Sequence, residues 1–236
     1  MAKISRLSAT AGMALLLSSP VTHAARPFVT DDARLTTAQS CQLESWMRVY
    51  SKSSELWALP ACNPGGNLEI TAGGGRARFD DAPSTKDYVF QAKTLFKTLE
   101  DDGYGLGFAV GKVWHPGVNP GPNLLGNTYA YIPATFSFLD SRSLVHANLG
   151  WLSDKATQRD NLTWGVGSEF ALTRRFSVMA ESFGDNRANP YWQAGVRVFL
   201  VPDRVQIDST VGQQWHGEKE SRWFSIGLRL TPDKLF

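Results

Sequence analysis

Apolar and polar residues alternate along the last stretch of the chain. Every second position is apolar between residues 224 and 230, at Phe224, Ile226, Leu228 and Leu230, and the intervening residues are polar or glycine. Side chains of a β-strand point alternately to its two faces, so such a segment has one apolar face and one polar face. An apolar outer face and a polar inner face are typical of a strand in a membrane-spanning β-barrel.

The same alternation recurs through most of the chain. It is found in residues 68–72, 88–97, 104–111, 129–138, 145–151, 162–172, 176–181, 192–200 and 205–214. Together with the closing stretch and a hairpin at residues 41–62, these segments predict an all-β, transmembrane, up-and-down antiparallel barrel of 12 strands. If the hairpin stays outside the barrel, the count is 10 strands. Aromatic residues near the ends of the apolar faces, among them Tyr88, Trp114 and Trp223, predict girdles at the membrane interfaces.

Connections between the predicted strands alternate in length. The tight turns are residues 101–103, 140–142, 173–175 and 202–204, and the longer connections are residues 80–87, 115–126, 153–161, 184–190 and 215–221. Outer-membrane barrels have short turns on the periplasmic side and longer loops outside. The closing strand therefore runs towards the periplasm.

The N-terminus has the features of an export signal. Lys3 and Arg6 precede a short apolar run at residues 12–17, and Thr22-His23-Ala24 forms a small-x-small cleavage site. The run falls well short of the ~20 residues that a spanning helix needs. We therefore predict a signal peptide at residues 1–24, a periplasmic lead-in at residues 25–40 and a barrel at residues 41–236, exported to the outer membrane of a Gram-negative bacterium.

Cys41 and Cys62 are the two cysteines of the chain. Export places them in an oxidising compartment, and folding the hairpin about residues 51–54 brings them opposite each other, which predicts a disulfide. A zinc site is the poorer alternative because no histidine lies near either cysteine. Pro60 lies in the second strand of the hairpin and predicts an edge-like or incomplete strand there.

Motifs near both ends of the chain carry a family resemblance. They are Pro-Phe-Val-Thr-Asp-Asp-Ala at residues 27–33, Cys-Gln-Leu-Glu-Ser-Trp at residues 41–46, the runs at residues 57–64 and 66–69, and Gly-Leu-Arg-Leu at residues 227–230. The chain resembles a largely uncharacterised family of proteobacterial outer-membrane β-barrels related to transporters of the phenol meta-pathway group. This resemblance implies a transport role, with aromatic compounds as one solute class, and no catalytic residues.

Charged residues at inward-facing positions are the candidate lumen residues. Arg197 and Asp208 lie symmetrically about the turn near residue 203, so we expect them to face each other as an ion pair. The other candidates are Lys93, Lys97, Glu169, Glu181 and Arg229. A barrel of this size is wide enough either to be packed shut by such side chains or to remain a narrow pore. These residues therefore form a structural network or a selectivity lining.

The sequence favours a passive channel or transporter for small solutes over other functions. A formal net charge of +2 with no block of Lys or Arg excludes a nucleic-acid partner. A non-conducting structural or adhesive barrel is the alternative. A membrane-embedded lipid hydrolase is a minor one, because His146 faces inward beside Asn148 and no His-x-Ser pair occurs.

No catalytic, metal-binding or cofactor-binding residue is predicted, and no cofactor is expected. The expected partners are outer-membrane lipid, the outer-membrane assembly machinery, which would recognise the closing strand, and a small solute of unknown identity.

Overall fold

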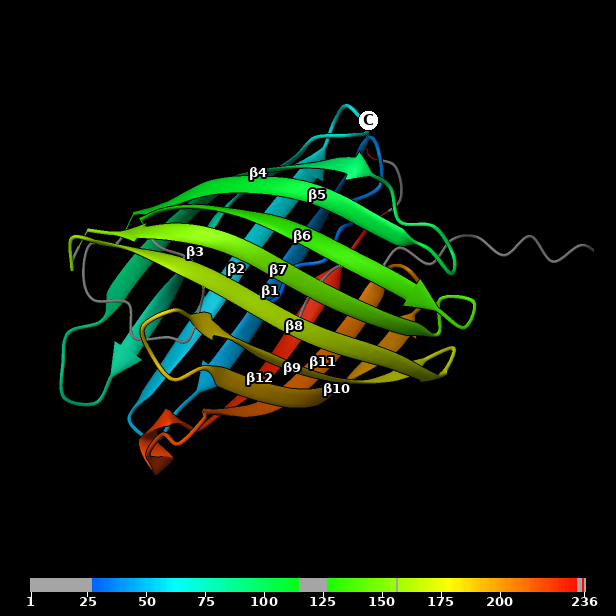
Figure 1. Ribbon diagram of the computed structural model, residues 1–236. Helices are drawn as coiled ribbons and strands as arrows, with labels where there is room; N and C mark the ends of the chain where they lie inside the picture. Colours follow the sequence, from blue (N-terminus) through cyan, green and yellow to red (C-terminus); the bar gives the residue numbers. More distant parts are fainter. Residues whose placement is uncertain (1–26, 115–126, 156, 233–234, 236) are drawn as a thin grey trace, which may run out of the picture.

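The computed structural model describes residues 27–114, 127–155, 157–232 and 235. Its strands form a closed antiparallel barrel in which each strand pairs with the next in sequence and β12 pairs with β1 (Figure 1). The prediction of an all-β up-and-down barrel with 12 strands is confirmed, because the hairpin at residues 41–62 supplies β1 and β2. The strands are β1 (Ser40–Val49), β2 (Ser53–Asn63), β3 (Glu69–Phe79), β4 (Thr85–Lys97), β5 (Tyr104–Trp114), β6 (Thr128–Phe138), β7 (Ser143–Asp154), β8 (Arg159–Thr173), β9 (Phe176–Asp185), β10 (Tyr191–Val201), β11 (Val205–Gln214) and β12 (Trp223–Leu230), and a short 3-10 helix, η1 (Lys219–Ser221), precedes β12.

The two faces of the strands differ as the alternation predicts. In β12, Phe224 and Ile226 are 48% and 45% exposed, whereas Ser225 between them is 1% exposed. Large apolar side chains are exposed in the same way on the other strands, while polar and charged side chains are buried inside. The outside of the barrel therefore matches a lipid environment. Among the described residues, no helix is long and apolar enough to cross a membrane.

Trp223 departs from the predicted aromatic girdles. It is 3% exposed, and its ring lies 6.1 Å from the ring of Tyr191 and 5.4 Å from the guanidinium of Arg48. Because Phe224 occupies the outward position, the strand period turns Trp223 into the bore. Trp223 lies two residues before Ser225, which points inward, so the alternation of the strand already indicates that Trp223 points inward as well.

The two ends of the barrel differ in their connections. One end, here called the turn end, carries residues 64–68, 98–103, 139–142, 174–175 and 202–204 together with the C-terminus of β12. The other, the loop end, carries the described residues 50–52, 80–84, 127, 155, 157–158, 186–190 and 215–222. The tight turns expected from the sequence all lie at the turn end, which is the end predicted to face the periplasm.

Cys41 and Cys62 form the predicted disulfide and are paired across β1 and β2 near the turn end. The expectation of an incomplete second strand is wrong, since β2 runs from Ser53 to Asn63 and pairs with β1 throughout. Pro60 is accommodated because the pairing of β2 with β3 is interrupted between Ala58 and Ala61. A proline lacks the N–H that an uninterrupted ladder would need there.

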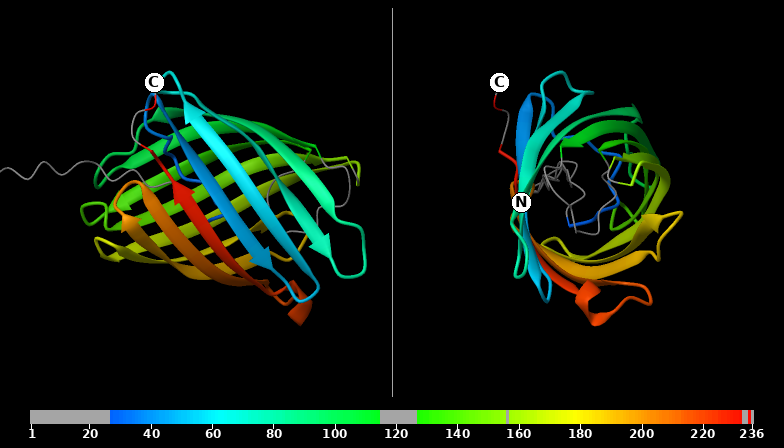
Figure 2. Two further views of the ribbon diagram at one scale, coloured as in Figure 1. Left: turned by 180° about the vertical axis from the view of Figure 1, so that it is seen from behind. Right: turned by 90° about the vertical axis from the view of Figure 1, so that its left-hand side faces the viewer.

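Residues 27–39 lie inside the barrel and are here called the plug. Figure 2 (right) looks along the bore, and this segment, drawn in blue, lies within the ring of strands. Thr30 and Ala33 are completely buried, and Gln39 donates a hydrogen bond to Asn63 at the turn end. Residues 27–39 of the predicted periplasmic lead-in (residues 25–40) therefore lie in the bore, whereas the predicted signal peptide at residues 1–24 lies outside the described residues.

Candidate functional site: the plugged lumen

The first residues of the plug, 27–30, are attached to β9 and β10. Glu181 accepts hydrogen bonds from the backbone N–H groups of Val29 (2.7 Å) and Thr30 (2.9 Å). The amide of Gln193 donates to the carbonyl of Pro27 (3.0 Å) and also to Glu181. Backbone groups that strand pairing would normally satisfy are satisfied here by side chains of the wall.

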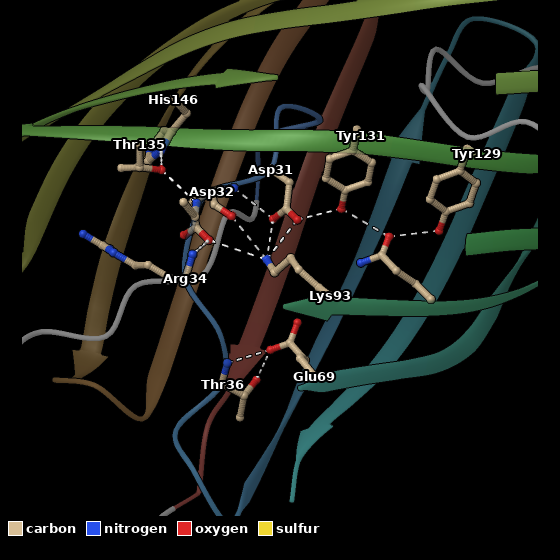
Figure 3. A network of polar contacts seen from close by, with 12 residues as sticks. Asp31, Asp32, Arg34, Thr36, Glu69, Lys93, Tyr129, Tyr131, Thr135 and His146 are labelled. Carbon is tan, nitrogen blue, oxygen red and sulfur yellow. Dashed lines mark hydrogen bonds and ion pairs between the residues drawn. The ribbon is translucent and has the colours of Figure 1, made fainter. Parts of the chain in front are cut away.

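Lys93 on β4 holds the middle of the plug. Its Nζ lies 2.9 Å from Asp31 Oδ2 and 3.8 Å from Asp32 Oδ1, and the Tyr131 hydroxyl donates to Asp31 Oδ2 at 2.7 Å (Figure 3). Complete burial raises the pKa of Asp32 to about 6, although the nearby ammonium of Lys93 opposes the rise. Removing one partner from such a buried cluster leaves uncompensated charge and is strongly destabilising.

The second half of the plug, from Ala33 onwards, is attached to β2, β3 and β6. Glu69 accepts from both the N–H and the hydroxyl of Thr36, each at 2.6 Å (Figure 3). Asn63 donates to the carbonyl of Thr36 at 2.7 Å, and Ala33 donates its N–H to the hydroxyl of Thr135 at 2.9 Å. The plug therefore touches several sectors of the wall along its length.

A glycine in β8 provides room for the plug. A Cβ at Gly165 would overlap the hydroxyl of Thr30. The absence of a side chain at this inward position lets the plug lie directly against the wall. The wall is thus shaped for this segment, in addition to being hydrogen-bonded to it.

The charged residues predicted on β8 to β12 are buried in the lumen and are here called the charged wall: Glu169, Glu181, Arg197, Asp208 and Arg229. Arg197 and Asp208 are register partners, as expected, and Arg197 forms an ion pair with Glu169 on β8. Arg229 donates to Gln42 on β1 at 3.2 Å. Glu181 thus holds the plug, as Lys93 does, while Glu169 and Arg197 hold each other.

Lys97 differs from the other predicted lumen residues. The pairing of β4 with β5 shifts between Leu95 and Lys97, so that Lys97 lies opposite Leu106 on the outward side. Its Nζ lies 2.9 Å from Glu100 and 5.0 Å from the centre of the Tyr104 ring. Strict alternation placed Lys97 beside Lys93 in the bore, but a bulge reverses the faces beyond it.

An aromatic surface covers the lumen side of β1, β2, β4 and β6. The rings of Trp46 and Trp57 are stacked with their centres 5.7 Å apart, and those of Tyr129 and Tyr131 are stacked 6.2 Å apart. With two neighbouring aliphatic residues they form the surface here called the aromatic wall: Trp46, Trp57, Leu59, Val89, Tyr129 and Tyr131. A cavity of about 180 Å³ lies between this wall and the plug.

Two inward glycines let the aromatic rings lie against the strands. A Cβ at Gly75 would overlap the Trp57 ring, and one at Gly111 would overlap the Tyr129 ring. Strand alternation alone assigns these tyrosines to the inward face, so the sequence contains the signal for their direction. It does not show that rings from three strands meet around one cavity.

His146 is 2% exposed and lies beneath the plug. The alternative function as a lipid hydrolase depends on this residue. Its Nδ1 is 3.0 Å from the Thr135 hydroxyl, and its ring is 5.3 Å from that of Phe28. A catalytic histidine has to reach its substrate, and this one is covered. Within the described ranges, no cluster of three His, Cys, Asp or Glu residues could hold a metal ion.

A family model matches residues 12–231 of the sequence, which is most of the chain. The chain belongs to the family described as uncharacterised conserved protein UCP029691. No curated protein matches the sequence. These comparisons do not link the chain to the phenol meta-pathway transporters that its terminal motifs resemble.

Solved porin structures share the fold of this chain. The KdgM porin matches with a TM-score of 0.61 at 8% identity, over 80% of this chain and 98% of that chain. The NanC porin matches with a TM-score of 0.57 at 8% identity, over the same shares of the two chains. At this identity the likeness establishes a common barrel architecture.

Proposed function

We propose that this protein is an outer-membrane channel for small solutes and that its plug controls conduction. The observation that carries the proposal is a closed barrel with an apolar exterior whose bore is occupied by a segment of its own chain, next to an unfilled cavity. The porin architecture of the similar structures supports this choice. The proposed setting is the outer membrane of a Gram-negative bacterium, reached through a cleaved signal peptide.

The way in which the plug is held supports a removable obstruction. It contributes no strand to the barrel, and many of its contacts are hydrogen bonds and ion pairs to side chains of the wall. Water can replace such contacts individually, so the segment can leave without breaking the strand ladder. A barrel of this size without its plug has room for a narrow pore.

The proposed solutes are small and include uncharged aromatic compounds, because the cavity beside the plug is bounded by the aromatic wall. Outer-membrane lipid would surround the apolar exterior. The outer-membrane assembly machinery is the proposed partner of β12, which ends at the turn end and closes the barrel against β1.

A second function is supported by the depth of the buried network. Arg197 is completely buried, and Glu181 and Lys93 are each 5% exposed. A plug held this firmly also suits a non-conducting barrel, in which the connections at the loop end would perform a structural or adhesive role.

Conductance recordings separate the two functions. The mature protein and a variant lacking residues 27–36 would be inserted into planar lipid bilayers at equal protein amounts. The channel proposal expects a low or intermittent conductance for the intact chain and a steady, larger conductance for the shortened chain. Matching far-UV circular dichroism spectra would establish that both form the barrel.

If the shortened chain does not fold, Gly165→Val provides the same test, because the added side chain would push Thr30 away from the wall. A folded barrel that does not conduct when the plug is deleted or displaced would overturn the channel function and favour the non-conducting barrel.

A further inference from the structure

We propose that the cavity between the plug and the aromatic wall binds one uncharged aromatic ring that carries a hydrogen-bonding substituent. This inference rests on the proposed channel function and specifies the solute class for which the bore is built. The cavity is lined by Trp57 from β2, Tyr129 and Tyr131 from β6, and Phe28 from the plug. A ligand there would contact both the wall and the obstruction.

The shape of the lining favours a planar ring. Trp46 and Trp57 stack at an interplanar angle of 11°, and Tyr129 and Tyr131 stack at 12°. Aromatic side chains bind flat rings through stacked or edge contacts in addition to the burial of apolar area. Because glycines behind Trp57 and Tyr129 allow these rings to lie against the strands, the space in front of them remains open.

The volume favours a single ring. An apolar cavity of about 150 Å³ is large enough to bind benzene, and this cavity measures about 180 Å³. The difference leaves room for a small substituent. A phenol-sized molecule therefore fits the space.

Polar groups for the substituent lie on β3 and β4. Thr71 and Gln91 are register partners that both line the cavity. The side-chain oxygen of Gln91 accepts hydrogen bonds from the hydroxyls of Tyr129 (2.9 Å) and Tyr131 (3.2 Å). Its amide nitrogen makes no hydrogen bond to any described residue, so its two N–H groups are available to an oxygen of the ligand.

The charges around the cavity disfavour an anion. Five acidic side chains line the cavity against four basic ones. Two of the basic groups are held by acidic neighbours: Arg48 lies 3.3 Å from Glu55, and Lys93 lies 2.9 Å from Asp31. A carboxylate would therefore lose its water in a cavity whose lining carries more acidic than basic groups. A sugar is disfavoured as well, because Thr71 and Gln91 cannot satisfy its many hydroxyl groups.

Equilibrium dialysis of radiolabelled phenol against the full mature protein in detergent tests this site directly. We expect saturable binding with one phenol per barrel. Trp57→Leu should weaken binding about tenfold, because it removes the stacking surface and part of the apolar contact. The matched control is Trp151→Leu, since Trp151 is on the outer face at 37% exposure and its loss should leave the affinity unchanged.

Thr71→Val provides a second variant that keeps the size of the side chain. It should weaken phenol binding about fivefold if the hydroxyl contacts the substituent. This variant keeps the test valid if Trp57→Leu does not fold.

Competition with unlabelled compounds defines the ligand class. Benzyl alcohol should displace phenol, while benzoate, cyclohexanol and glucose should displace it at least about tenfold less well. Equal binding by Trp57→Leu, equal competition by benzoate, or displacement by glucose would each overturn the proposal. None of these measurements depends on conductance, so a failure here leaves the channel function standing, and phenol binding by a non-conducting barrel would remove only the channel function.

Discussion

The charged wall and the aromatic wall lie in the same bore but have different roles. Side chains of the charged wall are engaged with one another or with the plug, as the Arg197–Glu169 pair and the Glu181 hydrogen bonds show. The aromatic wall leaves a cavity of about 180 Å³ open. Charge inside a barrel therefore does not by itself identify a selectivity lining, because it can serve to hold a segment in place. The surface left unfilled is the better candidate for solute contact.

Lys93→Met should have the largest effect among single substitutions. It removes the cation that Asp31 and Asp32 share and costs about 3 kcal/mol or more of plug attachment. That free energy raises the population of unplugged barrels more than about a hundredfold. Conductance in planar bilayers should rise accordingly.

Lys97→Met is the matched control for this prediction, because Lys97 has the same side chain but lies on the outer side. It should leave conductance unchanged. Equal effects of the two substitutions would contradict the assignment of Lys93 to the plug.

Arg197→Ala tests whether the charged wall is structural. The guanidinium is completely buried and paired with Glu169, so its loss should lower the free energy of unfolding by about 3 kcal/mol. Urea titrations of the detergent-solubilised barrel would measure this. In the variant lacking residues 27–36, Arg197→Ala should leave the ratio of cation to anion permeability nearly unchanged. A large change in that ratio at unchanged stability would restore Arg197 as a selectivity residue.

Gly75→Val should affect the aromatic wall without opening the bore. The added side chain would overlap the Trp57 ring and push it into the cavity, at a cost of about 1–3 kcal/mol for overpacking. We expect phenol binding to be lost while conductance stays as low as in the unaltered protein. A rise in conductance would show that the two walls are not independent.

Acidity should have a smaller effect than the loss of Lys93. Burial raises the pKa of Asp32 to about 6 in the plugged state, above its ordinary value of 3.8, so the plugged state binds this proton more tightly. The resulting stabilisation is complete near pH 4 and is lost as the pH rises through about 6. Conductance should therefore increase from pH 4 to pH 6, and Asp32→Asn should remove this dependence. A decrease over the same range would show that another group dominates.

Much of the barrel could be predicted from the sequence because its physics is local. Alternation determines which side chains face lipid, and this held from β3 to β12 apart from the bulge at Lys97. The plug could not be found in this way. Residues 27–39 have no periodicity, and their partners, such as Glu181 and Lys93, are distant in sequence. The sequence identified Glu181 and Lys93 as inward-facing charged residues, but it did not show that they bind residues 27–39.

The Cys41–Cys62 bond has a mechanical consequence for such a barrel. The plug continues directly into β1 at Ser40, one residue before the first cysteine. β1 also forms the seam with β12, the one neighbouring pair in the barrel that is not consecutive in the chain. A pull on the plug towards the turn end would load the start of β1, and the covalent link passes that force to β2. The plug can thus leave the bore while β1 and β12 stay paired.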